Sequence, residues 1–124
     1  MPTDRNTQVA ERFINEVCNA RKLNEASELF TQNCVHHDPS IPNIKPGPGG
    51  ITEAVSVYQT AFPDAKWNIR DVFSSGDKVT VRWTGVGTHN GELKGEGLNL
   101  RPTGKKVNVE GVYIFRIDKN QIAE

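Results

Sequence analysis

The sequence predicts an α+β fold in which helices come first along the chain and a meander of antiparallel strands follows. Apolar residues recur every three to four positions up to Phe62, the spacing of helices with one buried face. From Trp67 onward apolar and polar residues alternate, the spacing of half-buried strands. Helices that precede an antiparallel sheet pack on one of its faces. We therefore expect three N-terminal helices on a curved antiparallel sheet.

Three amphipathic segments define the expected helices. The first runs from about Thr7 to about Ala20, and one face carries Val9, Ala10, Phe13, Ile14 and Val17. A short second helix follows Asn24, whose side chain is a suitable N-cap. The third ends at Pro63-Asp64, and its apolar face holds Ile51, Ala54, Val55, Tyr58 and Phe62. Between the second and third helices, Cys34 to Asp38 reads as extended, and the proline-rich stretch from Pro39 to Gly50 predicts a mobile loop or a lid.

The strands begin with a hairpin around a turn at Ser75, Gly76 and Asp77. Its two sides carry alternating apolar residues, namely Trp67, Ile69 and Phe73, then Val79, Val81 and Trp83. A glycine-rich connection from Gly85 to Gly104 leads to a long strand from Val107 to Ile117. The last strand has barely begun at Glu124. We expect one domain over residues 1–124 with an incomplete final strand, so either the protein continues or a partner chain covers that edge.

Length and charge narrow the classes of function. The chain has 124 residues, enough for a single domain, and its 15 basic and 15 acidic residues give a net charge of zero. No basic stripe indicates a nucleic acid or an anionic membrane as partner. No signal segment or membrane-spanning run is present, and Cys18 and Cys34 form no metal-binding or redox motif, so we expect a cytoplasmic protein with reduced cysteines. The expected ligand is a small, hydrophobic molecule.

The most informative polar motif is the sequence from Val35 to Pro39. Neighbours in an extended segment point to opposite sides, so if Val35 is in the core, His37 faces inward and His36 is exposed. His37 and Asp38 then form a catalytic acid/base pair. The alternative is an Asp-Pro turn in which Asp38 bonds its own backbone.

Further candidates come from the strands and the third helix. His89 lies in a glycine-flanked loop at the rim of the expected pocket, or is a surface turn histidine. Arg82 could hold a substrate carbonyl or an enolate, or is a solvated residue of the outer sheet face. The full prediction assigns catalysis to His37, Asp38 and His89, and substrate binding to Arg82, Tyr58, Phe62 and Trp83. No histidine or cysteine spacing is typical of a metal site, so we expect acid/base chemistry without metal or cofactor.

Ordered signatures over nearly the whole chain resemble one family. The most specific are Ala61-Phe62-Pro63-Asp64, Gly87-Thr88-His89 with Gly91, and Pro102-Thr103-Gly104-Lys105. They look like the SnoaL-like polyketide cyclases, or ester cyclases, of the nuclear transport factor 2-like superfamily. The resemblance implies a cone-shaped α+β fold, a homodimer, and cofactor-free intramolecular aldol condensation of a polyketide ester. It matches His37, Asp38, Arg82 and His89 to polar positions of the family pattern.

The family pattern also implies a general base that no residue of this sequence matches. That aspartate follows the counterpart of the segment Asn120 to Glu124, and Asp38 is the candidate to replace it. The connection from Glu92 to Arg101 is longer than the family pattern and could reshape the mouth of the cone. We expect a cyclase acting on a small polyketide-like ester. A related isomerase or hydrolase of a small ring compound and a non-catalytic ligand-binding protein remain alternatives, because this fold is reused for many functions.

Overall fold

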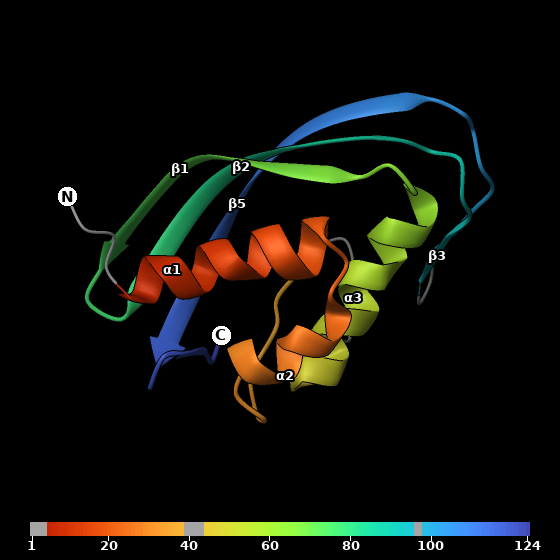
Figure 1. Ribbon diagram of the computed structural model, residues 1–124. Coiled ribbons are helices and arrows are strands. Elements are labelled where there is room, and N and C mark those ends of the chain that lie inside the picture. The colour runs from red at the N-terminus through yellow and green to blue at the C-terminus, as the bar shows by residue number, and fades with distance from the viewer. Residues whose placement is uncertain (1–4, 39–43, 96–97) are drawn as a thin grey trace.

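A computed structural model describes residues 5–38, 44–95 and 98–124. Helices lie against the concave face of a strongly curved antiparallel sheet, which confirms the predicted α+β class (Figure 1). The first helical stretch is α1 (Arg5–Arg12), continued by a π-helix, η1 (Phe13–Asn19). The second comprises a 3-10 turn, η2 (Leu23–Glu25), and α2 (Ala26–Leu29), and the third is α3 (Pro48–Ala61).

The sheet has the strand order β1-β2-β5-β6, and neighbouring strands are antiparallel. Its members are β1 (Lys66–Ser75), β2 (Lys78–Thr88), β5 (Lys106–Asp118) and β6 (Gln121–Ile122). The predicted hairpin and long strand are therefore confirmed. The predicted glycine-rich connection contains the end of β2 and a separate two-stranded hairpin, β3 (Leu93–Gly95) with β4 (Leu98–Leu100). Glycines obscured the end of β2 because they leave gaps in the apolar alternation.

The wide turns of η1 place the end of the first helix against β1. The carboxamide of Asn19 bonds the main chain of Trp67 twice, accepting from its N–H at 2.7 Å and donating to its carbonyl at 2.8 Å. Gln59 of α3 is buried and donates to the carbonyls of Val17 and Cys18. Gln59 thereby satisfies carbonyls that the helix end would otherwise leave unpaired, and Asn19 satisfies main-chain groups at the start of β1. They also fix the first helix relative to both α3 and the sheet.

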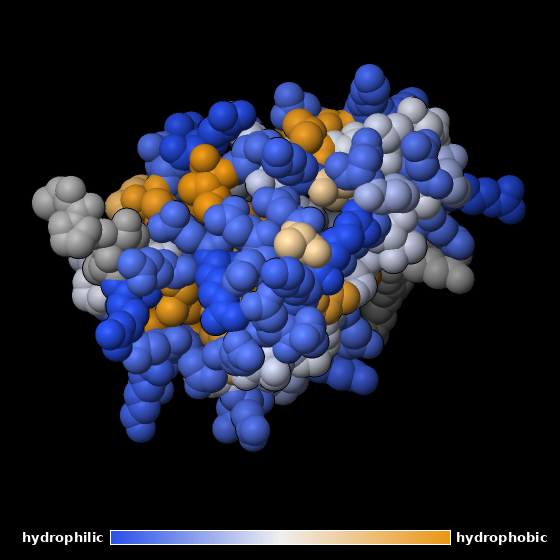
Figure 2. Space-filling view, viewed as in Figure 1, coloured by the Kyte–Doolittle hydropathy of each residue, from blue (hydrophilic) through white to orange (hydrophobic). Residues whose placement is uncertain are grey.

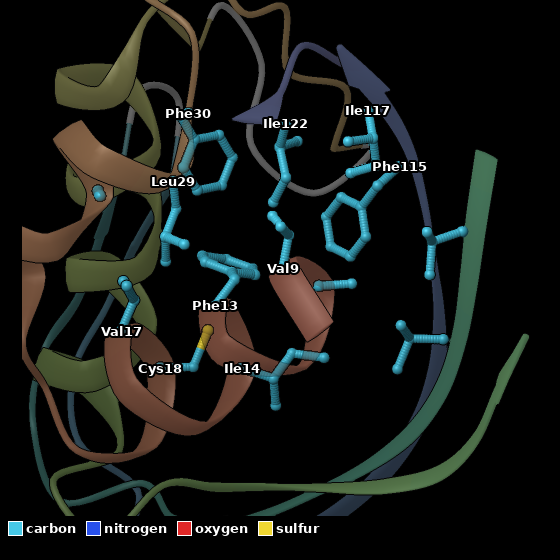
Figure 3. Packing of buried hydrophobic residues seen from close by; sticks show 14 of the residues in the cluster. Val9, Phe13, Ile14, Val17, Cys18, Leu29, Phe30, Phe115, Ile117 and Ile122 are labelled. Carbon is cyan, nitrogen blue, oxygen red and sulfur yellow. The ribbon is translucent and has the colours of Figure 1, made fainter. Parts of the chain in front are cut away.

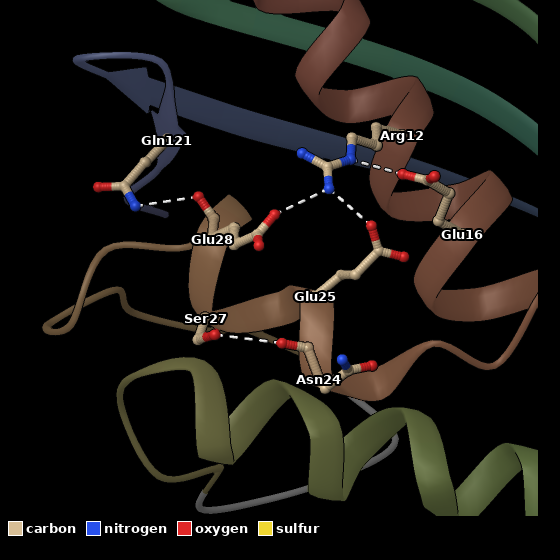
Figure 4. Close-up of polar contacts among 7 residues, drawn as sticks. All are labelled: Arg12, Glu16, Asn24, Glu25, Ser27, Glu28 and Gln121. Carbon is tan, nitrogen blue, oxygen red and sulfur yellow. Dashed lines mark hydrogen bonds and ion pairs between the residues drawn. The ribbon is translucent and has the colours of Figure 1, made fainter.

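The second helix begins differently from the prediction. Asn24 lies within η2 and its side chain caps nothing, whereas its carbonyl accepts from the Ser27 hydroxyl. Orientation of this short stretch comes instead from Arg12, whose guanidinium bonds Glu25 at 2.6 Å and Glu28 at 2.9 Å (Figure 4). A helix of one turn gains little from a cap alone, so packing and ion pairs determine where it starts.

The third helix begins earlier than predicted, inside the proline-rich stretch. Pro48 occupies the first helical turn, where its missing N–H costs nothing, and Gly47 precedes it with φ of 91°. The Gly47 N–H donates to the carbonyl of Cys34 at 2.9 Å. Residues 39–43 of the expected mobile loop or lid lie outside the described residues, and its last three residues belong to α3.

A β-bulge between Ile69 and Asp71 changes which residues of β1 face the helices. One extra residue reverses the alternation beyond it. Val72 consequently packs toward the core, whereas Phe73 is 59% exposed on the outer face. The prediction that Phe73 shares a face with Trp67 and Ile69 is therefore wrong.

The core lies between the first helix and the concave face of the sheet (Figure 3). Phe13 is at its centre, with ring centroids 5.1 Å from Phe30 and 5.8 Å from Phe115, both edge to face. Val79 and Val81 of β2 are fully buried beneath the helix, and Cys18 and Cys34 are buried free thiols. None of the helices described is long and apolar enough to cross a membrane.

Candidate active site

The extended segment after α2 is held beside β6, and this pairing sets the direction of its side chains. The Thr31 N–H donates to the Ile122 carbonyl and the Val35 N–H to the Ala123 carbonyl, each at 3.0 Å. Cys34 is fully buried and Val35 is 45% exposed. The small thiol, not the valine, therefore fills the core at this point.

The predicted inward direction of His37 is wrong for the same reason. His36 points inward with Cys34 and packs edge to face on Phe30, with ring centroids 5.7 Å apart. His37 points outward, and its side chain is 70% exposed. Alternation along the strand holds as expected, but its phase is shifted by one residue.

A cavity of about 160 Å³ lies beside this segment, between the helices and β5, and it opens at a rim that includes His37 and Glu124. Its walls are mainly aromatic and aliphatic. The aromatic residues are Phe13, Phe30, Tyr58, Trp67, Tyr113 and Phe115. A small apolar cavity with few polar groups is the usual form of a ligand site in proteins.

Asp38 places a carboxyl group at the wall of this cavity. The Tyr58 hydroxyl, from the middle of α3, donates to Oδ2 of Asp38 at 3.0 Å. A hydrogen bond from a helix side chain fixes the orientation of the carboxyl group although Asp38 itself lies on a loop. This contact is the one polar pairing of predicted site residues that the described structure brings together within the cavity.

Tyr113 supplies a second hydroxyl group to the same region. It lies on the concave face of β5, and burial raises the pKa of Tyr113 well above its usual range, with smaller contributions from Tyr58 and Asp38. The neighbouring Trp67 indole opposes this shift. The Tyr113 side chain lines the cavity together with Asp38.

The two neighbouring histidines have different environments. Nε2 of His36 lies 2.9 Å from the Gly47 carbonyl, which can only accept, so Nε2 is the donor there. The same nitrogen is 3.3 Å from the Cys34 thiol, whose pKa is raised by burial. His37 lies at the rim, where Nε2 is 2.9 Å from Glu124, and this bond lowers the pKa of Glu124 together with Arg116.

The remaining predicted site residues lie elsewhere. Arg82 is on the exposed outer face of the sheet, where it pairs with Asp71 at 2.7 Å. His89 is buried, packs on Phe62 with ring centroids 5.4 Å apart, and contacts the Thr103 hydroxyl through Nδ1 at 3.0 Å. None of Arg82, Phe62 and His89 lines the cavity that holds Asp38.

Trp83 packs against Tyr113, one of the residues that line the cavity. Its indole ring stacks beside Tyr113 at 5.1 Å and lies over Gly111 of β5. A Cβ atom at Gly111 would come within 2.3 Å of the indole, so only glycine leaves room for this ring. Trp83 therefore orients Tyr113 and does not itself line the cavity.

A wider groove of about 600 Å³ runs between η2 and α3. Its described walls include Glu53, Glu92 and several hydroxyl groups but no aromatic side chain. In the part of the chain that the structure describes, no group of three or more His, Cys, Asp or Glu side chains is arranged to hold a metal ion.

The sequence model of one family, the SnoaL-like polyketide cyclases, matches residues 8–124. The chain belongs to this family. A match of this extent covers every element that builds the cavity, from the first helix to β6. No curated protein sequence matches the chain significantly.

Solved structures show that this SnoaL-like chain shares the nuclear transport factor 2-like cone fold. A proposed polyketide cyclase from Acidithiobacillus ferrooxidans is 24% identical with a TM-score of 0.80, over 99% of this chain and 86% of that one. A proposed SnoaL-like polyketide cyclase from Jannaschia is 21% identical with a TM-score of 0.82 over the same shares. An LEH-like epoxide hydrolase from M. tuberculosis is 13% identical with a TM-score of 0.68, over 96% of this chain and 77% of that one. Such identities establish the fold and leave the reaction to be argued from the site.

Several residues of this SnoaL-like site were missed by the sequence analysis. Tyr113 and Phe115 alternate with exposed residues in β5 and share a face with Ile117. This alternation could have predicted that both side chains point inward. Phe13 and Trp67 were predicted as core residues only. His36 was assigned to solvent because Val35 was taken as the buried residue, and nothing in the local sequence distinguishes Val35 from Cys34 in that role.

Proposed function

We propose that this SnoaL-like protein catalyses aldol-type ring closure of a small hydrophobic, polyketide-like ester by acid/base chemistry without a cofactor. The observation that carries the proposal is the Asp38 carboxyl group, which meets aromatic surface and accepts a 3.0 Å hydrogen bond from Tyr58. A carboxylate oriented in this way can take a proton from a molecule bound in the cavity.

In the proposed step, Asp38 removes a proton from the carbon next to a substrate carbonyl. The electrons of the broken C–H bond form the enolate, whose oxygen carries the negative charge. The enolate carbon then attacks a second carbonyl of the same molecule, and the new C–C bond closes the ring. The oxygen of that second carbonyl takes the proton back from Asp38, so the enzyme ends unchanged. Holding both reacting carbons in contact contributes much of the rate, because a bound molecule needs no further ordering.

Tyr113 is the residue we assign to hold the enolate oxygen. Tyr113 lines the cavity, and its raised pKa keeps the phenol protonated at neutral pH, so that it can donate a hydrogen bond. A fixed donor directed at a developing oxyanion is worth roughly a hundred- to a thousandfold in rate. Tyr113 would therefore stabilise the negative charge of the enolate, and Asp38 would transfer the proton.

The same geometry supports a related isomerase as the second candidate. Asp38 at the cavity wall could remove a proton from one carbon of a bound ring and return it to another. A hydrolase would use Asp38 to activate water instead, and a non-catalytic binding protein would hold the ligand without proton transfer. Formation of a ring from a linear diketo ester, followed by mass spectrometry and NMR, separates the cyclase from these alternatives.

Deuterium exchange tests the proton transfer without knowledge of the natural substrate. Phenylacetone carries acidic protons between its ring and its carbonyl group, and NMR in deuterium oxide follows their loss. We expect the wild-type protein to accelerate this exchange and Asp38→Asn, which conserves size, to lower the acceleration by about a hundred- to ten-thousandfold. Asp71→Asn is the matched control, because Asp71 is an exposed carboxylate on the outer face.

Two results would count against the proposal. Exchange at the wild-type rate in Asp38→Asn would show that another group is the base. Binding of phenylacetone without any acceleration by the wild-type protein would favour the non-catalytic alternative.

A further inference from the structure

We infer that the substrate is an uncharged molecule whose body is a single six-membered ring or a chain that folds into one, and not a polycyclic polyketide. The inference rests on the proposed function, because it names the substrate class for the same cavity. It follows from the volume of the cavity, the rigidity of its walls and the charges at its edge.

The volume admits little more than one ring. The cavity measures about 160 Å³. An engineered protein cavity of about 150 Å³ binds one benzene molecule, whereas sites for drug-sized ligands measure roughly 300–1,000 Å³. One ring with a short carbonyl-bearing arm therefore fills this space, and a second or third fused ring exceeds it.

The inner wall of the cavity cannot withdraw to admit a larger ligand. Phe13 and Phe30 are each 2% exposed and Phe115 is 8% exposed, and they contact one another edge to face at the centre of the core (Figure 3). Moving any of them would disturb the packing between the first helix and the sheet, which is as dense as an organic crystal. The depth of the cavity is thus fixed by the core.

The chemistry of the lining selects an uncharged ring. Aromatic side chains on several sides favour a planar or near-planar body that they can contact by face and edge. Asp38 and Glu124 line the cavity and repel an anion, and among the described residues no Lys or Arg lines it. A ketone or ester oxygen can instead accept a hydrogen bond from Tyr113, on the concave face of β5.

A series of ketones that differ only in ring number tests the limit. Dissociation constants for phenylacetone, naphthylacetone and phenanthrylacetone can be measured by NMR titration of the wild-type protein. We expect phenylacetone to bind most tightly and phenanthrylacetone to bind at least about tenfold more weakly, because overfilling a packed site is costly. Binding of phenanthrylacetone at least as tight as that of phenylacetone would overturn the inference.

A pair of α3 variants links the limit to this cavity. Ile51 lines the cavity and is partly buried, so Ile51→Ala enlarges the cavity, whereas Val57→Ala changes the groove on the other side of the helix. We expect Ile51→Ala to reduce the preference for phenylacetone over naphthylacetone by about tenfold, and Val57→Ala to leave it unchanged. An unchanged preference in Ile51→Ala, with its fold confirmed by circular dichroism, would overturn the inference.

The exchange assay separates failure of this inference from failure of the proposed function. Asp38-dependent exchange on phenanthrylacetone as fast as on phenylacetone would overturn the size limit and leave the base assignment standing. The expected order of affinities with no exchange on any ketone would support the size limit and overturn the proposed acid/base role.

Discussion

At the scale of single residues, the site depends on a carboxyl group that lies on a loop but is oriented by a helix. Asp38 follows an extended segment held by β6, and Tyr58 reaches it from α3. Sequence analysis identified both residues as candidates, since each lies in a recognisable motif or helix face. It did not pair them, because they are 20 positions apart and no local rule connects them.

Tyr58→Phe should lower the turnover of the exchange reaction by roughly fivefold, because one hydrogen bond of about 1 kcal/mol is lost from Asp38. The phenyl ring keeps the cavity wall, so ligand affinity and unfolding should change little. Ser56→Ala, a hydroxyl deletion that faces the other groove of α3, is the control. Steady-state kinetics of the exchange measures the effect, and an unchanged turnover would mean that Tyr58 does not orient the base.

His89→Asn tests whether this histidine is structural. The sequence suggested a loop histidine that supports little core, but the ring is only 6% exposed and packs on Phe62. We expect the free energy of unfolding to fall by about 1–3 kcal/mol, because a buried contact and a hydrogen bond to Thr103 are lost. Exchange should remain within about threefold of wild type. Urea denaturation measures the first effect. A loss of exchange with unchanged stability would place His89 in the chemistry.

At the scale of helices and strands, the sequence predicted element types better than the direction of side chains. The hairpin, the long strand and the first helix could be predicted because apolar residues recur at regular spacing in each of them. The sequence did not show which face of the sheet Val72 and Phe73 occupy. A bulge is an irregularity of strand pairing, and the alternation of apolar residues alone does not reveal it. The shifted phase at His36 and His37 has a similar origin, since hydrogen bonds with β6 decide it.

Asp64 joins the connection after α3 to the end of β2 and should make stability depend on pH. The N–H and the hydroxyl of Thr88 donate to its carboxylate at 2.6 and 2.8 Å and lower the pKa of Asp64 below the usual range of an aspartate. A lowered pKa stabilises the fold above the unfolded value, and this contribution is lost as pH falls through the folded value.

The difference in unfolding free energy between wild type and Asp64→Ala should therefore be largest near neutral pH and vanish well below about pH 3.8. Urea denaturation at several pH values measures it. Glu53→Ala, at an exposed carboxylate of α3, is the control. A difference that grows on acidification would contradict the assignment.

At the scale of the whole molecule, the helices cover only the concave face of the sheet (Figure 1). Apolar surface remains among hydrophilic side chains where the strands run, along the upper edge of the view in Figure 2. On the outer face, Phe73, Val112 and Ile114 are 59%, 55% and 65% exposed. Thr80 of β2 pairs with Phe73 of β1 on one side and with Ile114 of β5 on the other. Phe73 and Ile114 therefore lie on the same face and form one patch. We propose that two copies of the chain pair through this face, as the resemblance to the family implied.

Ile114→Lys should then convert a dimer into a monomer, because a charge at the centre of the patch would be buried without a partner. Val109→Lys is the control, since Val109 is also exposed on β5 but faces the opposite side. Light scattering at micromolar concentration measures both. A monomeric wild-type protein would remove the proposal.

The central claim is that the chemistry takes place in the small aromatic cavity beside Asp38. A crystal structure of the protein with phenylacetone bound tests it most directly. The account predicts density for the ketone among Phe13, Tyr58 and Tyr113, with its acidic carbon about 3–3.5 Å from the Asp38 carboxyl group and its oxygen toward Tyr113. A ketone bound instead in the groove between η2 and α3, or on the outer face of the sheet, with the cavity empty, would contradict it.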